Sequence, residues 1–261
     1  MDRTNQEQFM GNIRSALGYP VQERRNGKKI FANKLTDETR QILDRIKMRS
    51  SAERQKLFDQ LLEAAGPINL DVSLKKDFTE VTAAICDLAK SKSPEWGDEK
   101  RLVIWKHPLL ARMGLEEKLA EQHIESFVTD SEVPEPGEHL TKEVREEIRH
   151  KIAASYIGVT GADFCLADTA TLVMRNRVGQ PRSVAVVPSI HVAVIEQNQI
   201  VSDLKEFYAL LKWDPDAGRE GLTNYMAFIS GPSKTADIEA TLVHGAHGPR
   251  EVYIYVIAAQ D

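Results

Sequence analysis

Cysteine is scarce in this chain of 261 residues, which has only Cys86 and Cys165. The two lie too far apart in the sequence to form a CxxC metal-ligand pair. Two thiols also cannot hold an iron–sulfur cluster through the usual four cysteines. We expect a reduced protein with buried thiols. If the protein takes part in redox chemistry, its clusters must belong to a partner.

Long apolar runs and a strong charge of one sign are also missing. No apolar run approaches the ~20 residues that a membrane helix needs, and the N-terminus lacks the apolar core of a signal peptide. We therefore expect a cytoplasmic protein without a membrane span. The net charge of −5 and the pI of about 5.9 argue against nucleic acid or an anionic membrane as the main partner.

Several well-known site motifs are absent from the sequence. No GxGxxG follows a strand pattern, no Walker A loop is present, and no GxSxG nucleophile elbow occurs. A conventional dinucleotide site and an α/β-hydrolase triad are therefore unsupported.

Strand and helix patterns alternate from about residue 68 onward. The first part predicts strands at 68–74, 102–105 and 126–129, and helices at 78–88, 109–123 and from Thr141 onward, where Val144, Ile148, Ile152 and Tyr156 should face the core. The second part predicts strands at 163–166, 170–175, 183–187 and 191–195, a hairpin turn at 176–182 and a helix at 202–212. This alternation predicts an α/β fold with a largely parallel sheet layered by helices, and with antiparallel pairing in 163–195.

The first 67 residues read as an extension of this α/β domain, which we place at 68–261. Thr36 can cap one helix, Ser50-Ser51 interrupts the pattern, and a second helix ends at Gly66-Pro67. The apolar stripe of these helices must be covered by the same chain or by another subunit. A homo-oligomer formed through the N-terminal helices is one possibility.

A long polar segment lies between two apolar runs, 225–229 and 252–258. It reads GPSKTADIE from Gly231 and LVHGAHGP from Leu242. The pattern predicts a helix capped by Ser233 or Thr235, whose free N–H groups, together with Lys234, would bind an anion. Asp237 and Glu239 would repel a multiply charged ligand, which favours a small carboxylate. The alternative is a well-capped helix without a ligand.

A second polar block could supply proton-transfer groups. Asp168 could act as a general base if it were desolvated, and His191 follows Val187-Pro188-Ser189-Ile190 beside a strand. The alternatives are a turn that stabilises its own backbone and a histidine with a purely structural role. His244 and His247 are spaced for two metal ligands, but no third ligand is evident, so we expect no metal.

These segments resemble a known family. GPSKTADIE with LVHGAHGP, and GVTGAD (158–163), ADTATL (167–172) and VPSIH (187–191), resemble the LUD domain, in particular the lactate-utilisation protein C family. The resemblance covers roughly residues 70–261. The family usually has Ala-Glu-Thr-Gly-Thr where this chain has a shorter carboxylate at Asp168 and an added methyl at Ala170.

The resemblance implies a three-layer α/β/α sandwich like that of sugar-phosphate isomerases and CoA transferases. It also implies a part in oxidising L-lactate to pyruvate, with iron–sulfur clusters on partner subunits and no cofactor in this chain. The catalytic residues would be Asp168 and His191. The residues binding the small carboxylate or other anion would be Thr160, Asp163, Thr169, Thr171, Ser233, Lys234, Thr235, Asp237, Glu239 and His247.

Two other functions stay open. The chain could be a stand-alone enzyme acting on a sugar phosphate or an acyl-CoA, with Asp168 as the catalytic carboxylate. It could also be a non-catalytic scaffold whose polar motifs only fix turns and whose N-terminal helices bind a partner.

Overall fold

The structure is a computed structural model that describes residues 3–16, 35–95, 97–129, 141–214, 225–236, 242–244 and 247–259. It divides into two units, Met1–Gln41 and Ile42–Asp261. Helix α1 (Arg3–Ala16) belongs to the first unit, and helix α3 (Asp37–Lys47) crosses the division. Everything below concerns the second unit unless the first is named.

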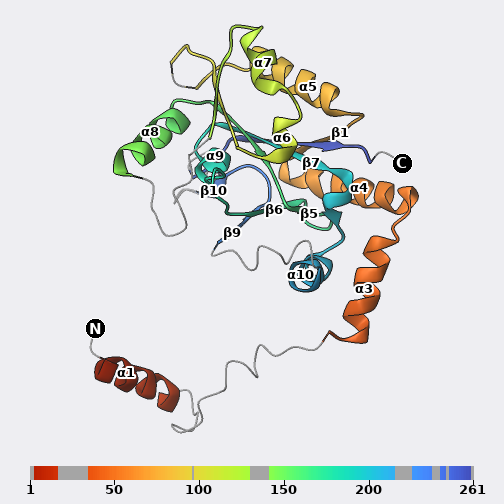
Figure 1. Cartoon of the computed structure of the whole chain (residues 1–261), viewed down its shortest axis with the longest axis vertical. Helices are drawn as coiled ribbons and strands as arrows, with labels where there is room; N and C mark the ends of the chain where they lie inside the picture. The colour runs from red at the N-terminus through yellow and green to blue at the C-terminus, as the bar shows by residue number, and fades with distance from the viewer. Residues whose placement is uncertain are drawn as a thin grey trace. The chain divides into compact units, whose positions relative to one another are not determined.

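A six-stranded parallel sheet forms the centre of the second unit (Figure 1). Its order is β1-β12-β7-β4-β2-β3, and all neighbouring strands run parallel. This confirms the predicted parallel sheet. The strands are β1 (Asp71–Lys75), β2 (Arg101–Ile104), β3 (Glu125–Val128), β4 (Ile157–Gly161), β7 (Ile190–Glu196) and β12 (Glu251–Ile257).

The inner strands are apolar along nearly their whole length because both of their faces are covered. All five residues of β4 and six of the seven in β7 are buried. Leu102, Val159, Val192 and Ile254, one from each of the four inner strands, have no solvent exposure. The hydrophobic core therefore lies along the middle of the sheet. A binding site has to be formed by side chains that lie beyond the ends of the strands.

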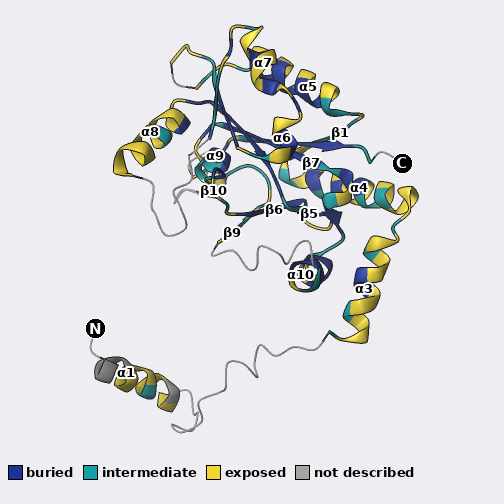
Figure 2. Ribbon diagram, in the orientation of Figure 1, coloured by how far each residue is buried: buried dark blue, intermediate teal, exposed yellow. Residues whose placement is uncertain are grey.

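Helices flank both faces of this sheet. Figure 1 shows α5 and α7 on one side, and α9, α10 and a smaller sheet on the other. Figure 2 shows the matching burial, with blue strands and yellow outer helix faces. The helices are α4 (Ser51–Ala65), α5 (Phe78–Ser91), α6 (Pro108–Ala111), α7 (Leu115–Ala120), α8 (Lys142–Ala153), α9 (Ser183–Val186) and α10 (Leu204–Trp213), with 3₁₀ turns η1 (Gly66–Ile68) and η2 (Gln197–Gln199).

Two helix starts have their predicted caps. Thr36, in the first unit, accepts a hydrogen bond from the N–H of Thr39, and Thr141 accepts one from the N–H of Val144. Ser50, where the sequence predicted an interruption, forms a reciprocal capping box with Glu53 at the start of α4. Each cap satisfies backbone donors that the first helical turn leaves without partners.

The smaller sheet has four strands in the order β8-β5-β6-β9. They are β8 (Ile200–Val201), β5 (Phe164–Leu166), β6 (Thr171–Arg175) and β9 (Met226–Ile229). β5 pairs with β6, and β6 with β9, in antiparallel fashion. The predicted antiparallel pairing is therefore present, but β7 belongs to the parallel sheet instead.

Helix α4 packs against the α/β core. Phe58, Leu61 and Ala65 are buried in the main hydrophobic cluster. Nearby, Arg49 forms an ion pair with Glu206 of α10, whose side chain is only 2% exposed. The same chain therefore covers the apolar face of α4. The domain boundary that we placed after residue 67 stays a prediction.

Three local predictions are wrong. Residues 183–186 form helix α9 rather than a strand. The helix packs closely on β4 at Gly158: a Cβ added to this glycine would lie 1.9 Å from the carbonyl oxygen of Val184. The helix predicted at 109–123 breaks at Gly114, which has φ +57°. Val144 is 38% exposed, so it does not share the core-facing stripe.

The predicted hairpin turn at 176–182 contains a bridge between Arg177 and Gln180. It does not join two paired strands, however, because β6 pairs with β5 and β9 and the chain continues into α9. The loop reaches the ends of β2 and β3 instead.

The helix predicted from Ser233 is also wrong. Lys234–Ala236 (β10) and Leu242–His244 (β11) form an antiparallel pair, with Lys234 opposite His244. Ser and Thr suit turns and strands as well as helix caps, which explains the misprediction. The anion site that depended on a helix start is therefore lost. Asp237 and Glu239 lie outside the described residues, as does the side chain of Thr235.

Candidate functional site

Two of the predicted site residues form a fully buried pair. The hydroxyl of Thr160 and Nε2 of His191 are 2.8 Å apart, and neither residue has solvent exposure. Burial lowers the pKa of His191 to about 4, so its ring is neutral near pH 7. The pair joins neighbouring strands β4 and β7 inside the sheet. The predicted proton-transfer role of His191 gains no support from this position.

Asp163 holds two arginines at the end of β4. Its carboxylate accepts hydrogen bonds from Nε of Arg175 at 2.8 Å and from a guanidinium N–H of Arg177 at 2.5 Å. Burial alone would raise the pKa of Asp163, but the bonds from Arg177 and from the backbone of Arg175 outweigh it, so the pKa is lowered. Asp163 therefore positions arginines, and its side chain is only 8% exposed.

The Asp168–Thr171 turn meets the start of the C-terminal motif. The hydroxyl of Thr171 lies 2.7 Å from that of Ser230 and 2.9 Å from that of Thr169, which in turn donates to Asp168 at 3.2 Å. The two polar segments thus come together at Thr171 and Ser230. The contacts within them are hydroxyl bonds that fix the turn, and Asp168 and Thr169 are exposed.

This junction lies at the end of the sheet where the parallel strands begin. Gly231 packs against Ile68, which precedes β1. The N–H of Ser233 donates to the carbonyl of Pro249, which precedes β12, and its hydroxyl accepts from the N–H of His247. The side chain of Lys234 is exposed. The C-terminal motif is therefore held at the amino edge of the sheet.

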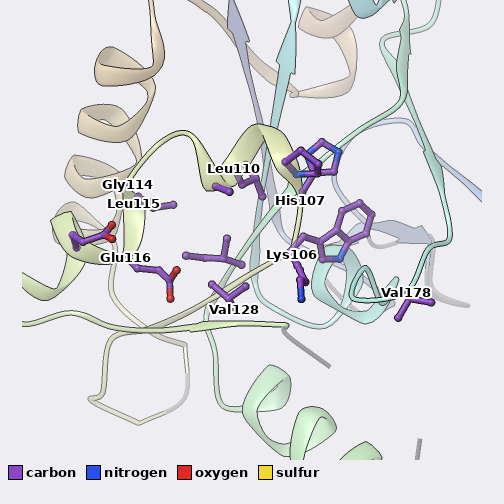
Figure 3. A pocket seen from close by; sticks show the side chains of 13 residues that line it. Lys106, His107, Leu110, Gly114, Leu115, Glu116, Val128 and Val178 are labelled. Atoms are coloured by element: carbon purple, nitrogen blue, oxygen red, sulfur yellow. The ribbon is translucent and has the colours of Figure 1, made fainter. Parts of the chain in front are cut away.

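A cavity of about 520 Å³ lies at the opposite, carboxyl edge. It includes none of the residues of the motif junction. The residues that line it follow β2 and β3 or belong to α6, α7 and the 176–182 loop: Ile104, Trp105, Lys106, His107, Pro108, Leu110, Ala111, Gly114, Leu115, Glu116, Glu117, Val128 and Val178. Figure 3 shows Glu116 on one side, Lys106 and His107 on the other, and Leu110 and Val128 between them.

The strand order explains this location. From β2 the chain moves outward to β3, and it then returns past β2 to β4 and continues in the other direction to β7 and β12. The switch lies between β2 and β4, and crevices form there because the connections diverge to either side. His107, which follows β2, packs against Gly161, the last residue of β4. The site lies at this switch.

His107 is held in one orientation. Its Nδ1 accepts the N–H of Leu109 at 3.2 Å, so in the neutral ring the proton is on Nε2. A Cβ on Gly161 would lie 2.8 to 3.0 Å from three ring atoms, so only glycine leaves room for the ring. Burial lowers the pKa of His107, and the charge of Arg177 lowers it further, against a smaller opposite effect of Asp163. His107 therefore offers a neutral N–H donor.

The 176–182 loop fixes one wall of the cavity. The hydroxyl of Thr129 and the N–H of Lys106 both donate to the carbonyl of Gly179, which has φ +75°. Gln180 donates to the carbonyl of Lys106, and Nε1 of Trp105 donates to that of Pro181. These bonds tie the ends of β2 and β3 to the loop that carries Arg177.

Sequence reasoning missed this cavity. The usable signal was the run Trp105-Lys106-His107-Pro108 directly after the buried strand, since parallel strands place their following residues at the ligand-binding edge. The cavity combines apolar walls with a few polar groups, as small-molecule sites usually do. The end with Lys106 and His107 can donate hydrogen bonds to an oxygen atom of a ligand, and the end with Glu116 can accept a hydrogen bond from a donor group of a ligand.

Other reactive groups lie away from the cavity. Cys86 and Cys165 are buried free thiols, and burial raises the pKa of Cys165 to about 12. In the part of the chain that the structure describes, no three His, Cys, Asp or Glu side chains are grouped as a metal site. None of its helices combines the length and apolarity needed to cross a bilayer.

Comparison with known proteins places the chain among named relatives. The LUD domain family model matches residues 58–257. The chain is 28% identical over 251 residues to a lactate utilization protein C of Halalkalibacterium halodurans, with 96% of each chain covered. It is 29% identical over 258 residues to one of an Exiguobacterium species, covering 97% of this chain and 96% of that one. A crystal structure of a DUF162 family protein from Deinococcus radiodurans matches with 17% identity and a TM-score of 0.46, covering 78% of this chain and 98% of that chain.

Proposed function

The chain belongs to the LUD domain family, and on this basis we propose that it works in a lactate-utilisation system. One observation carries the proposal. Proteins named lactate utilization protein C align with this chain over nearly its whole length. An alignment of that extent covers the cavity residues as well as the motif segments.

The specific role that we propose is participation in the oxidation of L-lactate to pyruvate, together with iron–sulfur partner proteins. The reaction releases two electrons, which clusters on partners would accept. This chain has two cysteines, both buried, whereas a cluster normally needs four thiolate ligands. The proposed division of labour therefore leaves ligand binding to this chain and electron transfer to its partners.

The cavity at the carboxyl edge is the proposed ligand site. Lys106 and His107 line one end of it, where a cation and a neutral N–H donor suit a carboxylate. Asp163 supports this end indirectly by holding Arg177. The predicted residues Ser233, Lys234 and His247 would instead order the motif at the amino edge.

We also propose that the fold is the three-layer sandwich of sugar-phosphate isomerases and CoA transferases. The parallel sheet with helices on both faces supports this assignment. A stand-alone reaction on a sugar phosphate or an acyl-CoA is less consistent with the cavity, because Glu116 and Glu117 line it and would repel a polyanion.

The N-terminal helices are the proposed partner surface, for iron–sulfur proteins or a second copy of the chain. In α1, Phe9, Met10 and Ile13 are 62, 40 and 39% exposed. Apolar side chains at this spacing share one face of a helix. A cytoplasmic location likewise stays part of the proposal.

Reconstitution tests the function. The chain is mixed with candidate iron–sulfur partners, and lactate-dependent reduction of an artificial electron acceptor is followed with and without it. We expect activity to require the chain. Unchanged activity after its omission would reject the proposal. If the chain is required but tolerates every cavity substitution, it acts as a scaffold.

A further inference from the structure

We propose that the cavity at the carboxyl edge binds an elongated zwitterion, whose carboxylate lies at His107 and whose ammonium group lies at Glu116 and Glu117. The inference rests on the proposed function, because it names a ligand class for the cavity already proposed as the ligand site. Its test measures binding to the chain alone, so its failure is distinguishable from a failure of the lactate-oxidation assay.

The cavity is larger than lactate requires. Lactate has six non-hydrogen atoms and takes roughly 180 Å³, if each atom takes the volume of about 30 Å³ that one water molecule has in the liquid. The cavity of about 520 Å³ is almost three times larger. By the same measure it accommodates a ligand of roughly 15–20 non-hydrogen atoms. Lactate alone would leave most of the apolar wall without contacts.

The His107 end suits an anionic oxygen. Nδ1 of His107 accepts a hydrogen bond from the N–H of Leu109. In the neutral ring the proton is therefore on Nε2, which can donate to a ligand. Burial and the nearby Arg177 oppose protonation of this ring more than Asp163 favours it, so the pKa of His107 is lowered. Lys106 lines the same end. A carboxylate is the ligand group that such a combination recognises.

The middle of the cavity is apolar. Ile104 ends β2, Val128 ends β3, and Leu110 and Leu115 come from α6 and α7. Leu110 and Val128 lie between the two polar ends (Figure 3). They favour a ligand whose charged ends are joined by a methylene chain or another apolar body, since each buried CH₂ contributes about 0.8 kcal/mol.

The far end is acidic. Glu116 and Glu117 follow Gly114, which has φ +57° and begins α7 after the break from α6. Figure 3 shows Glu116 across the cavity from His107. Two carboxylates attract an ammonium group and repel a second anionic group. The cavity therefore discriminates between a zwitterion and a dicarboxylate of equal length.

A series of ω-amino acids provides the probes. The full-length chain is titrated by calorimetry at low ionic strength with 3-aminopropanoate, 6-aminohexanoate and 8-aminooctanoate. Octanoate and octanedioate, which have the same eight carbons as the longest probe, and lactate serve as comparison ligands. The double variant Glu116→Gln/Glu117→Gln removes the acidic end. Glu63→Gln, on the exposed face of α4, is the control for a change of charge.

We expect affinity to rise along the amino acid series and 8-aminooctanoate to bind about tenfold more tightly than octanoate. The double glutamine variant should lose that preference and still bind octanoate, while Glu63→Gln behaves like the wild type. His107→Gln should weaken both ligands, with thermal unfolding used to verify that it folds.

Three outcomes would overturn the proposal. One is that none of the amino acids binds at millimolar concentration. Another is that octanoate or octanedioate binds as tightly as 8-aminooctanoate. The third is that the double glutamine variant keeps the preference for the amino acid.

Discussion

Ala170 occupies a backbone conformation that favours glycine. It has φ +47° in the turn between β5 and β6 and no solvent exposure. The left-handed region costs a non-glycine residue about 1–2 kcal/mol. The resemblance noted from the sequence places glycine at this position, and the backbone gives the physical reason for it.

Ala170→Gly should therefore change the free energy of unfolding by less than about 0.5 kcal/mol, because relief of about 1–2 kcal/mol of strain offsets the loss of a buried methyl, about 0.8 kcal/mol, together with the extra backbone entropy of glycine, about 0.5–1 kcal/mol. The matched control is Ala193→Gly in β7, which is equally buried and lies in regular strand. There we expect a loss of about 1–2 kcal/mol. Urea denaturation of both variants measures the difference, and equal losses would contradict the explanation.

His191 should make stability depend on pH. Its pKa is about 4 in the folded protein, whereas an unfolded chain gives about 6.5. As the pH falls through this window, the unfolded chain takes up a proton and the folded protein does not. Stability should therefore decrease toward low pH, by up to about 1.4 kcal/mol per unit. His191→Gln should give a shallower slope between pH 6 and 4.5 in urea denaturation series. An identical slope would mean that His191 titrates normally.

At the scale of single residues, three of the predicted site groups bond to the protein itself. Thr160 pairs with His191, and Asp163 accepts hydrogen bonds from Arg175. Burial determines whether such a group bonds to the protein or to a ligand, and burial depends on which strands become inner strands of the sheet. A single sequence does not reveal the order of the strands.

Among the elements, the close packing of α9 on β4 is the most sensitive to substitution. Gly158 faces the carbonyl of Val184, which leaves no room for a side chain. Gly158→Ala should force the two elements apart and lower the free energy of unfolding by about 1–3 kcal/mol or more. Gly11→Ala in α1, where no heavy atom lies within 4 Å, is the control and should not lower the melting temperature. A neutral Gly158→Ala would show that α9 packs differently.

Element prediction succeeded where local signals agree with the tertiary environment. Thr36 and Thr141 cap their helices, and β2 and β7 are apolar runs that become inner strands. It failed at 234–236 and 183–186, where Ser, Thr and Val suit either state. In both segments the neighbouring segment determines the secondary structure: β11 pairs with β10, and β4 leaves space for α9.

At the scale of the whole second unit, the two ends of the parallel sheet differ. The motif segments meet at the amino edge through Thr171 and Ser230, while the cavity opens at the carboxyl edge beside His107. The sequence predicted the parallel sheet. It did not reveal the cavity, because His107 approaches Gly161 across 54 residues of chain.

The most direct measurement compares the two edges in one assay. His107→Gln and Lys234→Ala are each introduced into the reconstituted lactate-oxidising system, after thermal unfolding has verified that both variants fold. Our account predicts that His107→Gln lowers lactate-dependent turnover at least about tenfold, equivalent to about 1.4 kcal/mol, and that Lys234→Ala stays within about twofold of the wild type. Full activity of His107→Gln together with loss of activity in Lys234→Ala would place the functional centre at the motif instead.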